Sequence, residues 1–328
     1  MKNKLLYKLC SGKNPKFIYY SINIFRQLLP KCFFQMRLQR KLESVSRRKD
    51  VEYIKQRVDY YNKLPFGIKL PSSASYLAEH KMGNQKVYFF DTYQYTRWFP
   101  NSFQWGFCPG DVTYIPEYPS IVKSRPLTEN NGNSVVMKLD KVRHFLFVND
   151  KKGFVEKKDM VIFRGKVKGK APRRKFMEMY FHHPMCDLGD VSKNTTDPVE
   201  WQTEKKTIRE HLDYKFVMAL EGNDVASNLK WVMSSNSIAV MPRPTCETWF
   251  MEGNLIPNYH YIEIKPDFSD LEERLCYYIA HVDESLEIIK HAHEYVEQFK
   301  DKKRESLISL LVLDKYFRAT GQKDEDES

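Results

Sequence analysis

The feature that most constrains the fold is a regular alternation of short apolar runs with helical patterns, which begins at residue 159 and continues to the last helix. The runs with the composition of buried strands are 159–164, 185–189, 215–220, 237–241 and 259–264. The helical segments are 174–182, 208–214, 226–234, a short one at 247–251, 271–299 and 305–320. This alternation predicts an α/β fold whose parallel, doubly wound sheet carries helices on both faces. Ligands of such sheets bind beyond the carboxyl ends of the strands.

The chain before residue 159 is less regular. Residues 86–92 have the aromatic and β-branched density of a buried strand, and 93–99 resemble the start of a helix. Four prolines in 107–126 exclude a helix and predict an ordered loop that ends a strand. We therefore expect an N-terminal arm over 1–57, an acceptor-side α/β domain over 58–155 and a second α/β domain over 156–328 that a C-terminal helix closes.

The basic excess of the chain lies in the first of these segments. Residues 1–57 hold 15 Lys and Arg against three acidic residues, whereas the rest of the chain holds 38 bases and 39 acids. A net charge of +12 on an arm and −1 on the body indicates contact with a polyanion, either an anionic membrane face or nucleic acid. The alternative is a solvated basic extension that has no dedicated partner.

The pattern within the arm favours a membrane. Between residues 17 and 42 large apolar side chains alternate with Arg and Lys, and Pro30 should break the segment into two short helices. No apolar run reaches 18 residues, so the segment suits a helix in a membrane interface and not a spanning one. The alternative is that its aromatic side chains pack on the body.

Cysteine, histidine and motif content exclude several classes of protein. Six cysteines are scattered without a C-x-x-C pair, and nine histidines show no metal-ligand spacing. We expect no disulfide framework, no metal site and a reducing compartment, most simply the cytosol. G-x-G-x-x-G, G-x-x-x-x-G-K-[ST], G-x-S-x-G and H-E-x-x-H are all absent, which weakens dinucleotide-binding, P-loop NTPase, hydrolase and metalloprotease functions.

Polar residues at the predicted strand ends are the candidates for a binding site. Arg164 stands beside Gly165 at the end of the first strand, and a guanidinium fork next to a close-approach glycine suits a diphosphate. Gly222 precedes a predicted helix whose N-terminal amide groups could face an anion. Asn223 or Asp224 could equally be the N-cap of that helix.

These positions carry a family resemblance. The order F-R-G (163–165), Y-K-F-V-M-A-L-E-G-N-D (214–224), S-N-S-I-A-V (235–240), E-T-W-F (247–250), N-Y-H-Y-I-E-I (258–264) and D-L-E-E-R (270–274) resembles glycosyltransferase family 90. The similarity extends from about residue 88 to the C-terminus and looks closest to the bacterial lipopolysaccharide core branch of that family.

The resemblance implies a GT-B architecture, in which two Rossmann-like domains face each other across a cleft and the C-terminal one holds most of the nucleotide-sugar. It also implies an inverting, metal-independent transfer from a UDP-sugar, with no cofactor. Cationic side chains must then neutralise the leaving diphosphate, with Arg164 as the first candidate and Lys230 as the second. A family arginine expected after E-G-N falls at Asn228, which moves that contact to Lys230 or Arg243. The expected nucleotide-sugar-binding residues are Phe163, Arg164, Gly165, Glu221, Gly222, Asn223, Asn228, Lys230, Ser237, Arg243, Glu247 and His260.

An inverting transfer needs a general base on the acceptor side. The family places an Asp at the end of a strand before a Pro-containing loop, and Asp111 fits that description, with Glu117 as the alternative. Without the resemblance, Asp111 would be an ordinary turn residue after Gly110. Glu247 is expected to bond a ribose or sugar hydroxyl, while a histidine within a strand, such as His260, is more often packed than catalytic.

The resulting hypothesis is a transferase that moves a hexose from UDP-glucose, UDP-galactose or a related donor to a heptose of the lipopolysaccharide inner core. Its partners would be the donor, the core acceptor and, through residues 1–57, the anionic inner face of the bacterial inner membrane, where the enzyme would be peripheral and cytoplasmic. The competing hypotheses are a nucleic-acid-binding protein that uses the same arm and a protein O-glycosyltransferase. The near-neutral body without RNA-binding signatures disfavours nucleic acid, and the scattered cysteines disfavour a secretory enzyme.

Overall fold

The computed structural model describes residues 12 and 14–324, and the described chain forms two compact units. Unit 1 contains residues 143–245 and 253–298, together with residues 12 and 14, and unit 2 contains 15–142, 246–252 and the segment from 299 onward. Each unit is thus assembled from separated segments, whereas the sequence analysis expected continuous domains. Residues 1–11 and 13 of the predicted arm lie outside the described residues.

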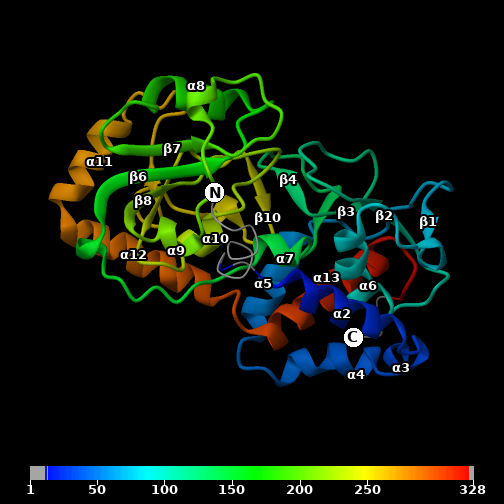
Figure 1. Ribbon diagram of the computed structural model, residues 1–328. Helices are drawn as coiled ribbons and strands as arrows, with labels where there is room; N and C mark the ends of the chain where they lie inside the picture. The colour runs from blue at the N-terminus through cyan, green and yellow to red at the C-terminus, as the bar shows by residue number, and fades with distance from the viewer. Residues whose placement is uncertain (1–11, 13, 325–328) are drawn as a thin grey trace. The chain divides into compact units, whose positions relative to one another are not determined.

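Unit 1 is built on a parallel sheet of five strands (Figure 1). The strands are β6 (Lys158–Gly165), β7 (Cys186–Asp190), β8 (Tyr214–Met218), β9 (Ile238–Met241) and β11 (Ile262–Glu263). Their order across the sheet is β11-β9-β8-β6-β7, and every neighbouring pair is parallel. The sequence-predicted parallel α/β sheet is confirmed. The order reverses between β6 and β8, which makes that point the topological switch of a Rossmann-like sheet.

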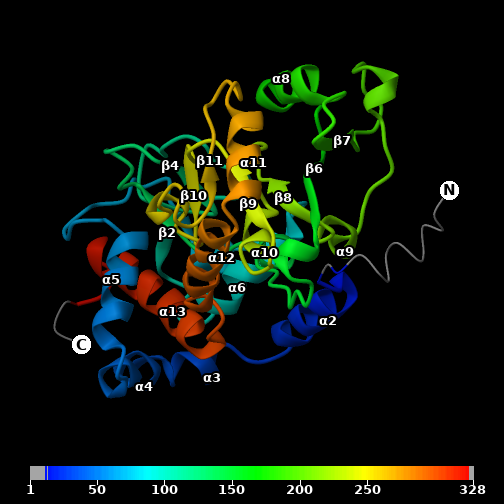
Figure 2. The ribbon, with the colours of Figure 1, turned by 90° about the vertical axis from the view of Figure 1, so that its left-hand side faces the viewer.

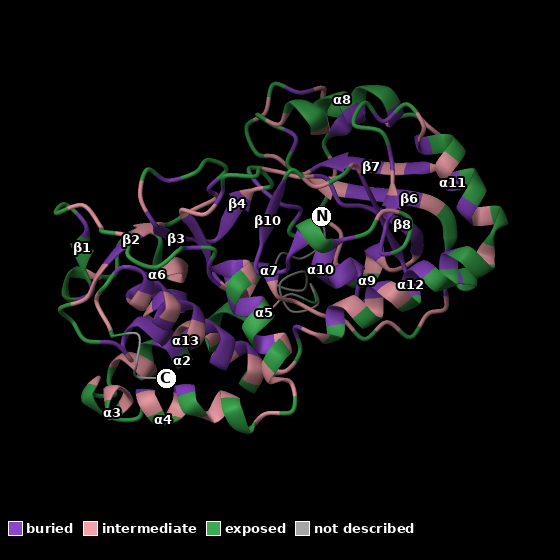
Figure 3. Cartoon of the chain, turned by 180° about the vertical axis from the view of Figure 1, so that it is seen from behind, coloured by how far each residue is buried: buried purple, intermediate pink, exposed green. Residues whose placement is uncertain are grey.

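The helices of unit 1 follow the strands as the alternation predicted. They are α8 (Ala171–Tyr180), α9 (Ile208–His211), α10 (Leu229–Val232), α11 (Leu271–Ala280) and α12 (Val282–Glu297), with short 3-10 turns η3 (Phe154–Glu156) and η4 (Val199–Trp201). In Figure 3, α8 and α11 turn exposed residues outward while β8 is buried. Val161 and Phe163 point to one face of β6 and Ile162 to the other, and all three are buried, so both faces of the sheet are covered.

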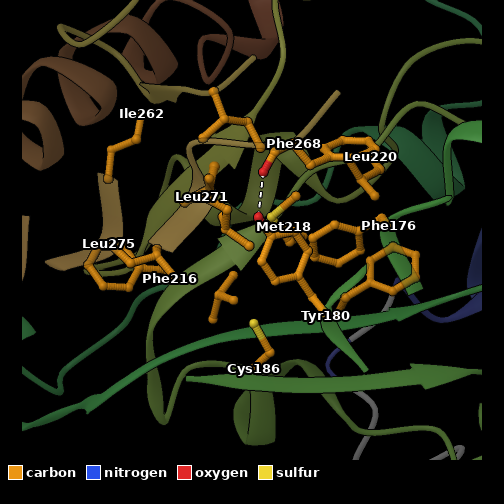
Figure 4. Packing of buried hydrophobic residues seen from close by; sticks show 14 of the residues in the cluster. Phe176, Tyr180, Cys186, Phe216, Met218, Leu220, Ile262, Phe268, Leu271 and Leu275 are labelled. Carbon is orange, nitrogen blue, oxygen red and sulfur yellow. Dashed lines mark hydrogen bonds between the residues drawn. The ribbon is translucent and has the colours of Figure 1, made fainter. Parts of the chain in front are cut away.

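One hydrophobic cluster joins the sheet of unit 1 to helices α8, α11 and α12, and Figure 4 shows part of it. Phe176 and Tyr180 of α8 and Leu271 of α11 pack on Phe216 and other strand residues. The Tyr180 hydroxyl donates a 2.6 Å hydrogen bond to the carbonyl of Phe268, so this polar group is satisfied within the cluster. The cluster therefore fixes α8 against the sheet, which matters for the site at the strand ends.

Unit 2 combines short parallel strands with a helical layer. Strands β2 (Gln104–Cys108), β3 (Ser120–Val122) and β5 (Ser134–Val136) are parallel neighbours, and β1 (Ser75–Tyr76) joins β2 in the antiparallel sense. A separate antiparallel pair consists of β4 (Ser124–Pro126) and β10 (Cys246–Thr248). The helices are α2 (Lys16–Gln27), α3 (Cys32–Gln35), α4 (Leu38–Glu43), α5 (Val51–Tyr61), α6 (Lys86–Thr96) and α13 (Lys302–Ala319), with η1 (Ser44–Arg47), η2 (Leu77–Glu79), η5 (Glu252–Asn254) and α7 (Lys141–His144) in the connections.

The core of unit 2 lies between α5 and α13, which run side by side (Figure 2). Glu305 on α13 is buried and accepts bonds from Arg57 at 2.6 Å, Lys138 at 2.7 Å and the indole of Trp249 at 2.6 Å. The Trp249 ring in turn stacks on Tyr61 with 3.9 Å between ring centroids. A single carboxylate therefore compensates two cations from different segments of the core.

Two local predictions in unit 2 are wrong, and a third is incomplete. Residues 86–92 form helix α6 and not a strand, because Phe89, Thr92 and Thr96 recur at helical spacing on its buried side. Residues 247–251 are not a helix, because Glu247 pairs across β10 and β4 with Arg125, an attraction between segments far apart in the sequence. The 107–126 window is not helical, as predicted, but it contains β3 and β4 in addition to the loop.

The described part of the basic segment packs on unit 2. The predicted break at Pro30 is confirmed, since α2 ends at Gln27 and α3 begins at Cys32. The Tyr19 hydroxyl donates to Asp91 at 2.8 Å, and Arg26 donates to Gln94 at 3.0 Å, so the polar side of α2 faces α6. The apolar side of α2 is exposed, and so are apolar residues that follow it. The exposed large side chains are Phe17, Ile18, Ile22, Ile24 and Phe25 in α2, and Leu28, Leu29, Phe33 and Met36 after it.

Candidate functional site

The carboxyl edge of the unit 1 sheet, at the switch point between β6 and β8, is the candidate binding site. One side chain ties the two strand ends together. Arg173, in the first turn of α8, donates to the carbonyl of Glu221 at 2.9 Å, to that of Leu220 at 2.7 Å and to that of Lys166 at 3.0 Å. The guanidinium of Arg173 therefore lies across the end of β6 and the segment that follows β8.

Two glycines make room for this guanidinium. A Cβ atom on Gly165 would stand 2.6 Å from the ring of Phe163 and 3.3 Å from Nη1 of Arg173. A Cβ atom on Gly222 would stand 3.1 Å from Nη2 of Arg173. The glycines of the F-R-G and E-G-N motifs are thus explained by close approach of backbone to one arginine. Phe163 itself is buried in the hydrophobic cluster.

Arg164 is committed to a different contact. Its guanidinium forms an ion pair with the carboxylate of Asp187 and donates to the carbonyls of Phe163 and Asp187, both at 2.8 Å. Burial acts to raise the pKa of Asp187, but the Tyr214 hydroxyl and Arg164 outweigh it and lower that pKa. Arg164 thus compensates a carboxylate between β6 and β7.

The other two predicted cations, Lys230 and Arg243, differ in their exposure to solvent. The side chain of Lys230 on α10 is fully buried. Arg243 follows β9, is 72% exposed and pairs with Glu263 at 3.0 Å. The amide of Asn228 donates to the carbonyl of Met218 at 2.9 Å, which places Asn228 next to the end of β8.

The structure brings several other predicted residues to the same edge. The carboxylate of Glu221 accepts from the backbone N–H of Thr245 at 2.9 Å and from its hydroxyl at 2.6 Å. The side chain of Asn223 accepts a bond from Lys170. Asn223 does not cap α10, because that helix begins only at Leu229, so the N-cap interpretation of Asn223 and Asp224 is wrong.

Three predicted residues lie elsewhere. Ser237 precedes β9 and donates to the carbonyl of Tyr214 at 2.7 Å, which places it at the amino edge of the sheet. Glu247 belongs to unit 2, where it is buried, pairs with Arg125 at 2.8 Å and accepts a bond from the Tyr60 hydroxyl.

His260 is the third predicted residue that lies away from the candidate site. It is buried and accepts a 2.9 Å bond from the backbone N–H of Ile256, and burial lowers its pKa to about 4. An imidazole held neutral in this way is a packed histidine. It lies in the turn before β11, and the strand predicted over 259–264 is limited to residues 262–263.

Asp111 occupies the corresponding edge of unit 2. It follows β2, while Lys123 follows the parallel neighbour β3, so the two side chains meet at the carboxyl ends of these strands. They form an ion pair in which Lys123 is buried and Asp111 is 17% exposed, and the Tyr88 hydroxyl lies 3.4 Å from the carboxylate. The pair thus places a carboxylate at the carboxyl edge of these strands. Glu117 is exposed in the loop that follows.

Sequence reasoning missed Arg173 and Lys123 as site residues. Arg173 lies among several basic residues after β6, and only its contact with Leu220 and Glu221 distinguishes it from them. Lys123 looks like a surface residue at the end of an apolar strand. The available signal was topological, because parallel neighbours end at the same edge. Within the described chain, we find no group of three or more His, Cys, Asp and Glu side chains arranged to hold a metal ion.

Comparison with known proteins identifies a family and a relative. The family model for glycosyl transferase family 90 matches residues 132–316, which is more than half of the chain. The O-glucosyltransferase LpsA of Dichelobacter nodosus is 36% identical over 315 residues, which cover 95% of this chain and 98% of that relative.

Proposed function

This chain belongs to glycosyltransferase family 90 and is a glycosyltransferase, and we propose that it transfers a hexose from a UDP-sugar to the lipopolysaccharide inner core. Its relative is named an O-glucosyltransferase, so glucose is the first donor sugar to test and galactose the second. The observation that carries the proposal is the convergence of the F-R-G and E-G-N motifs at the switch point of a parallel sheet, next to a guanidinium. The acceptor would be a heptose hydroxyl of the core.

The proposed architecture is GT-B, with unit 1 as the donor side and unit 2 as the acceptor side. Both units contain parallel strands, and each has a charged site at the carboxyl edge of those strands, which supports this assignment. The sequence-predicted boundaries 58–155 and 156–328 differ from those of the two units, because residues 143–155 group with unit 1, while residues 246–252 and the segment from 299 onward, with helix α13, group with unit 2.

The proposed reaction is a single inverting displacement. The carboxylate of Asp111 accepts the proton of the acceptor hydroxyl, and that oxygen forms a bond to the anomeric carbon. The bond from this carbon to the β-phosphate oxygen breaks, and UDP leaves with the electron pair. Fixed cations on the donor side stabilise the departing diphosphate, so we expect transfer without a divalent ion.

Asp111→Asn tests the assignment of the base. We expect transfer to fall by a factor of about 100 or more, the contribution of a positioned general base, while UDP affinity stays close to that of the unmodified chain. Glu117→Gln is the matched variant and should retain transfer. Loss of transfer in Glu117→Gln but not in Asp111→Asn would move the base to Glu117, and loss of both transfer and UDP affinity in Asp111→Asn would contradict a role confined to proton transfer.

The decisive experiment for the whole proposal is a donor and acceptor screen. Purified enzyme is incubated with UDP-glucose or UDP-galactose and with deacylated core oligosaccharide, and product mass, linkage stereochemistry and UDP release are measured. We expect an inverted linkage on a heptose, unaffected by EDTA. Activity that disappears with EDTA and returns with manganese would refute the metal-independent mechanism, and transfer only to a protein acceptor would replace the core as substrate.

The proposed location is the cytoplasmic face of the inner membrane. No helix in the described ranges combines the length and apolar character that a membrane span requires. Instead, the apolar side of α2 is exposed, and Lys16, Arg37 and Arg40 are exposed nearby in a segment whose first acidic residue is Glu43. Large apolar side chains next to cations suit the interface of an anionic membrane, which supports peripheral attachment through this segment.

A further inference from the structure

Within the described chain, Arg173 differs from most buried arginines in that no carboxylate pairs with its guanidinium. Arg57, Arg125 and Arg164 each face a carboxylate, from Glu305, Glu247 and Asp187 respectively. Arg173 donates only to backbone carbonyl oxygens, and no acidic partner for it is found in the part of the chain that the structure describes. It is therefore a partly buried cation without a counter-charge.

A partly buried positive charge is energetically unfavourable unless an anion neutralises it. Burial lowers the pKa of Arg173 to about 10, which reports the unfavourable solvation of its charged form. A guanidinium has five N–H groups in a planar fork, and the three bonds to carbonyls use one each on Nε, Nη1 and Nη2. One N–H thus remains on each terminal nitrogen, an arrangement that matches two oxygens of a phosphate.

We propose that Arg173, and not Arg164, binds the diphosphate of the nucleotide-sugar donor, an inference that rests on the proposed function. Three independent features converge on this residue: the switch point of the sheet, the two glycines that lie against its guanidinium, and the missing counter-charge. A second cation on the same edge is Lys170, which bonds the neutral side chain of Asn223. The chemical class of the ligand is therefore a dianionic or trianionic phosphate ester.

The direction of the strand explains why Arg164 does not take this role. Residues 163 and 165 of β6 point to the face that α8 covers, and residue 164 points to the opposite face. There Arg164 pairs with Asp187, which Lys206 also approaches at 3.6 Å, so its guanidinium is held on the face opposite to that of Phe163 and Arg173. Arg173 approaches from α8 on the same face as Phe163, whose ring lies 5.7 Å from its guanidinium carbon.

The position of Arg173 also suits the chemical step. As the bond between the anomeric carbon and the β-phosphate oxygen breaks, negative charge builds up on the diphosphate. A guanidinium held by three carbonyls is already oriented and needs no reorganisation at that moment.

The test is calorimetric titration of the full chain with UDP and, separately, with uridine. Arg173→Gln should weaken UDP binding by about tenfold or more, the factor of one charge-assisted contact, and leave uridine binding unchanged. Arg174→Gln is the matched control. Arg174 carries the same charge as its neighbour Arg173, but it is exposed and pairs with Glu178 at 2.9 Å, so this variant should bind UDP like the unmodified chain. Arg173→Lys keeps the charge and should recover part of the affinity.

The outcomes separate this inference from the proposed function. If the unmodified chain does not bind UDP, the proposed donor is wrong. If it binds UDP and Arg173→Gln binds UDP equally well, or if Arg164→Gln loses UDP affinity selectively while Arg173→Gln does not, the assignment to Arg173 is wrong. Equal loss of UDP and uridine in both Arg173 variants also overturns it, because the side chain then serves only to hold the strand ends together.

Discussion

The exposed apolar side of α2 gives the sharpest prediction about how this enzyme reaches its acceptor. Phe25 and Leu28 are 64% and 74% exposed on that side. Full burial of such a side chain contributes about 1.5–3 kcal/mol, so insertion of the exposed fraction contributes roughly 1–2 kcal/mol each. The double variant Phe25→Glu/Leu28→Glu should therefore lose about 3 kcal/mol of membrane binding, which corresponds to roughly a hundredfold weaker partition.

Sedimentation with lipid vesicles measures this partition. Vesicles that contain phosphatidylglycerol should bind the unmodified chain more tightly than phosphatidylcholine vesicles, and the difference should decrease with added salt because the basic side chains contribute about 1 kcal/mol each at an anionic surface. Val199→Glu/Ile256→Glu is the matched control, since these side chains in unit 1 are 82% and 54% exposed. That control should sediment like the unmodified chain.

Two results would refute the reasoning. The first is equal vesicle binding by the α2 double variant and the unmodified chain. The second is a dimer in light scattering without lipid that the α2 substitutions convert to a monomer, because the apolar side would then pair two copies. Transfer to a soluble core oligosaccharide should be unchanged in the α2 variant, which separates a membrane defect from a folding defect.

Three further predictions follow from two buried ionisable groups, Glu305 and Cys186. Glu305→Gln leaves two buried cations without their carboxylate and should lower the free energy of unfolding by about 3–5 kcal/mol in urea denaturation, whereas the exposed Glu52→Gln should change it by less than about 0.5 kcal/mol. Burial acts to raise the pKa of Glu305, but Lys138 and Arg57 outweigh this effect, so the pKa lies below the ordinary 4.5. The stabilisation is therefore present above pH 4.5 and should be lost as the pH falls below it, in denaturation curves recorded from pH 7 to 3. Burial raises the pKa of Cys186 to about 12, so iodoacetamide at pH 8 should alkylate the exposed Cys276 first and leave Cys186 unmodified until the chain unfolds, as peptide mass mapping can show; early modification of Cys186 would contradict its burial.

The fold of unit 1 could be predicted because its strands are buried on both faces. Parallel strands of this kind are short, continuous apolar runs, and the strands at 159–164, 215–220 and 237–241 were placed to within a residue or two of β6, β8 and β9. The failures occurred where pairing is non-local or composition is ambiguous. Strand β10 depends on Arg125 opposite Glu247, and α6 carries aromatic residues that suit a strand equally well.

The start of α13 shows a local signal that the sequence analysis overlooked. The helix begins at Lys302 and not at 305, because the carboxylate of Asp301 accepts bonds from the backbone N–H groups of Lys303 and Arg304 at 2.9 and 3.0 Å. An Asp before a helical pattern is a recognisable N-cap. The information that fixes this helix start lies in four consecutive residues, whereas the pairing of β10 depends on residues far apart in the sequence.

For the candidate site too, the sequence predicts the features that depend on neighbouring residues and misses those that depend on contacts between distant residues. Close approach of backbone to a ligand or side chain requires glycine, and Gly165 and Gly222, which the sequence analysis selected, lie against the guanidinium of Arg173. The availability of a cation depends on its partner, and the partner of Arg164 is Asp187, which lies on the next strand. Charge compensation is a property of pairs that the fold brings together. From the sequence, Arg164 is the candidate for the diphosphate because it is adjacent to Gly165. The contacts of Arg173 across the strand ends, on which our proposal rests, are seen only in the structure. The same reasoning predicts that, in other α/β proteins, an arginine beside a strand-end glycine is best judged by the acid content of the neighbouring strand before it is assigned to a phosphate.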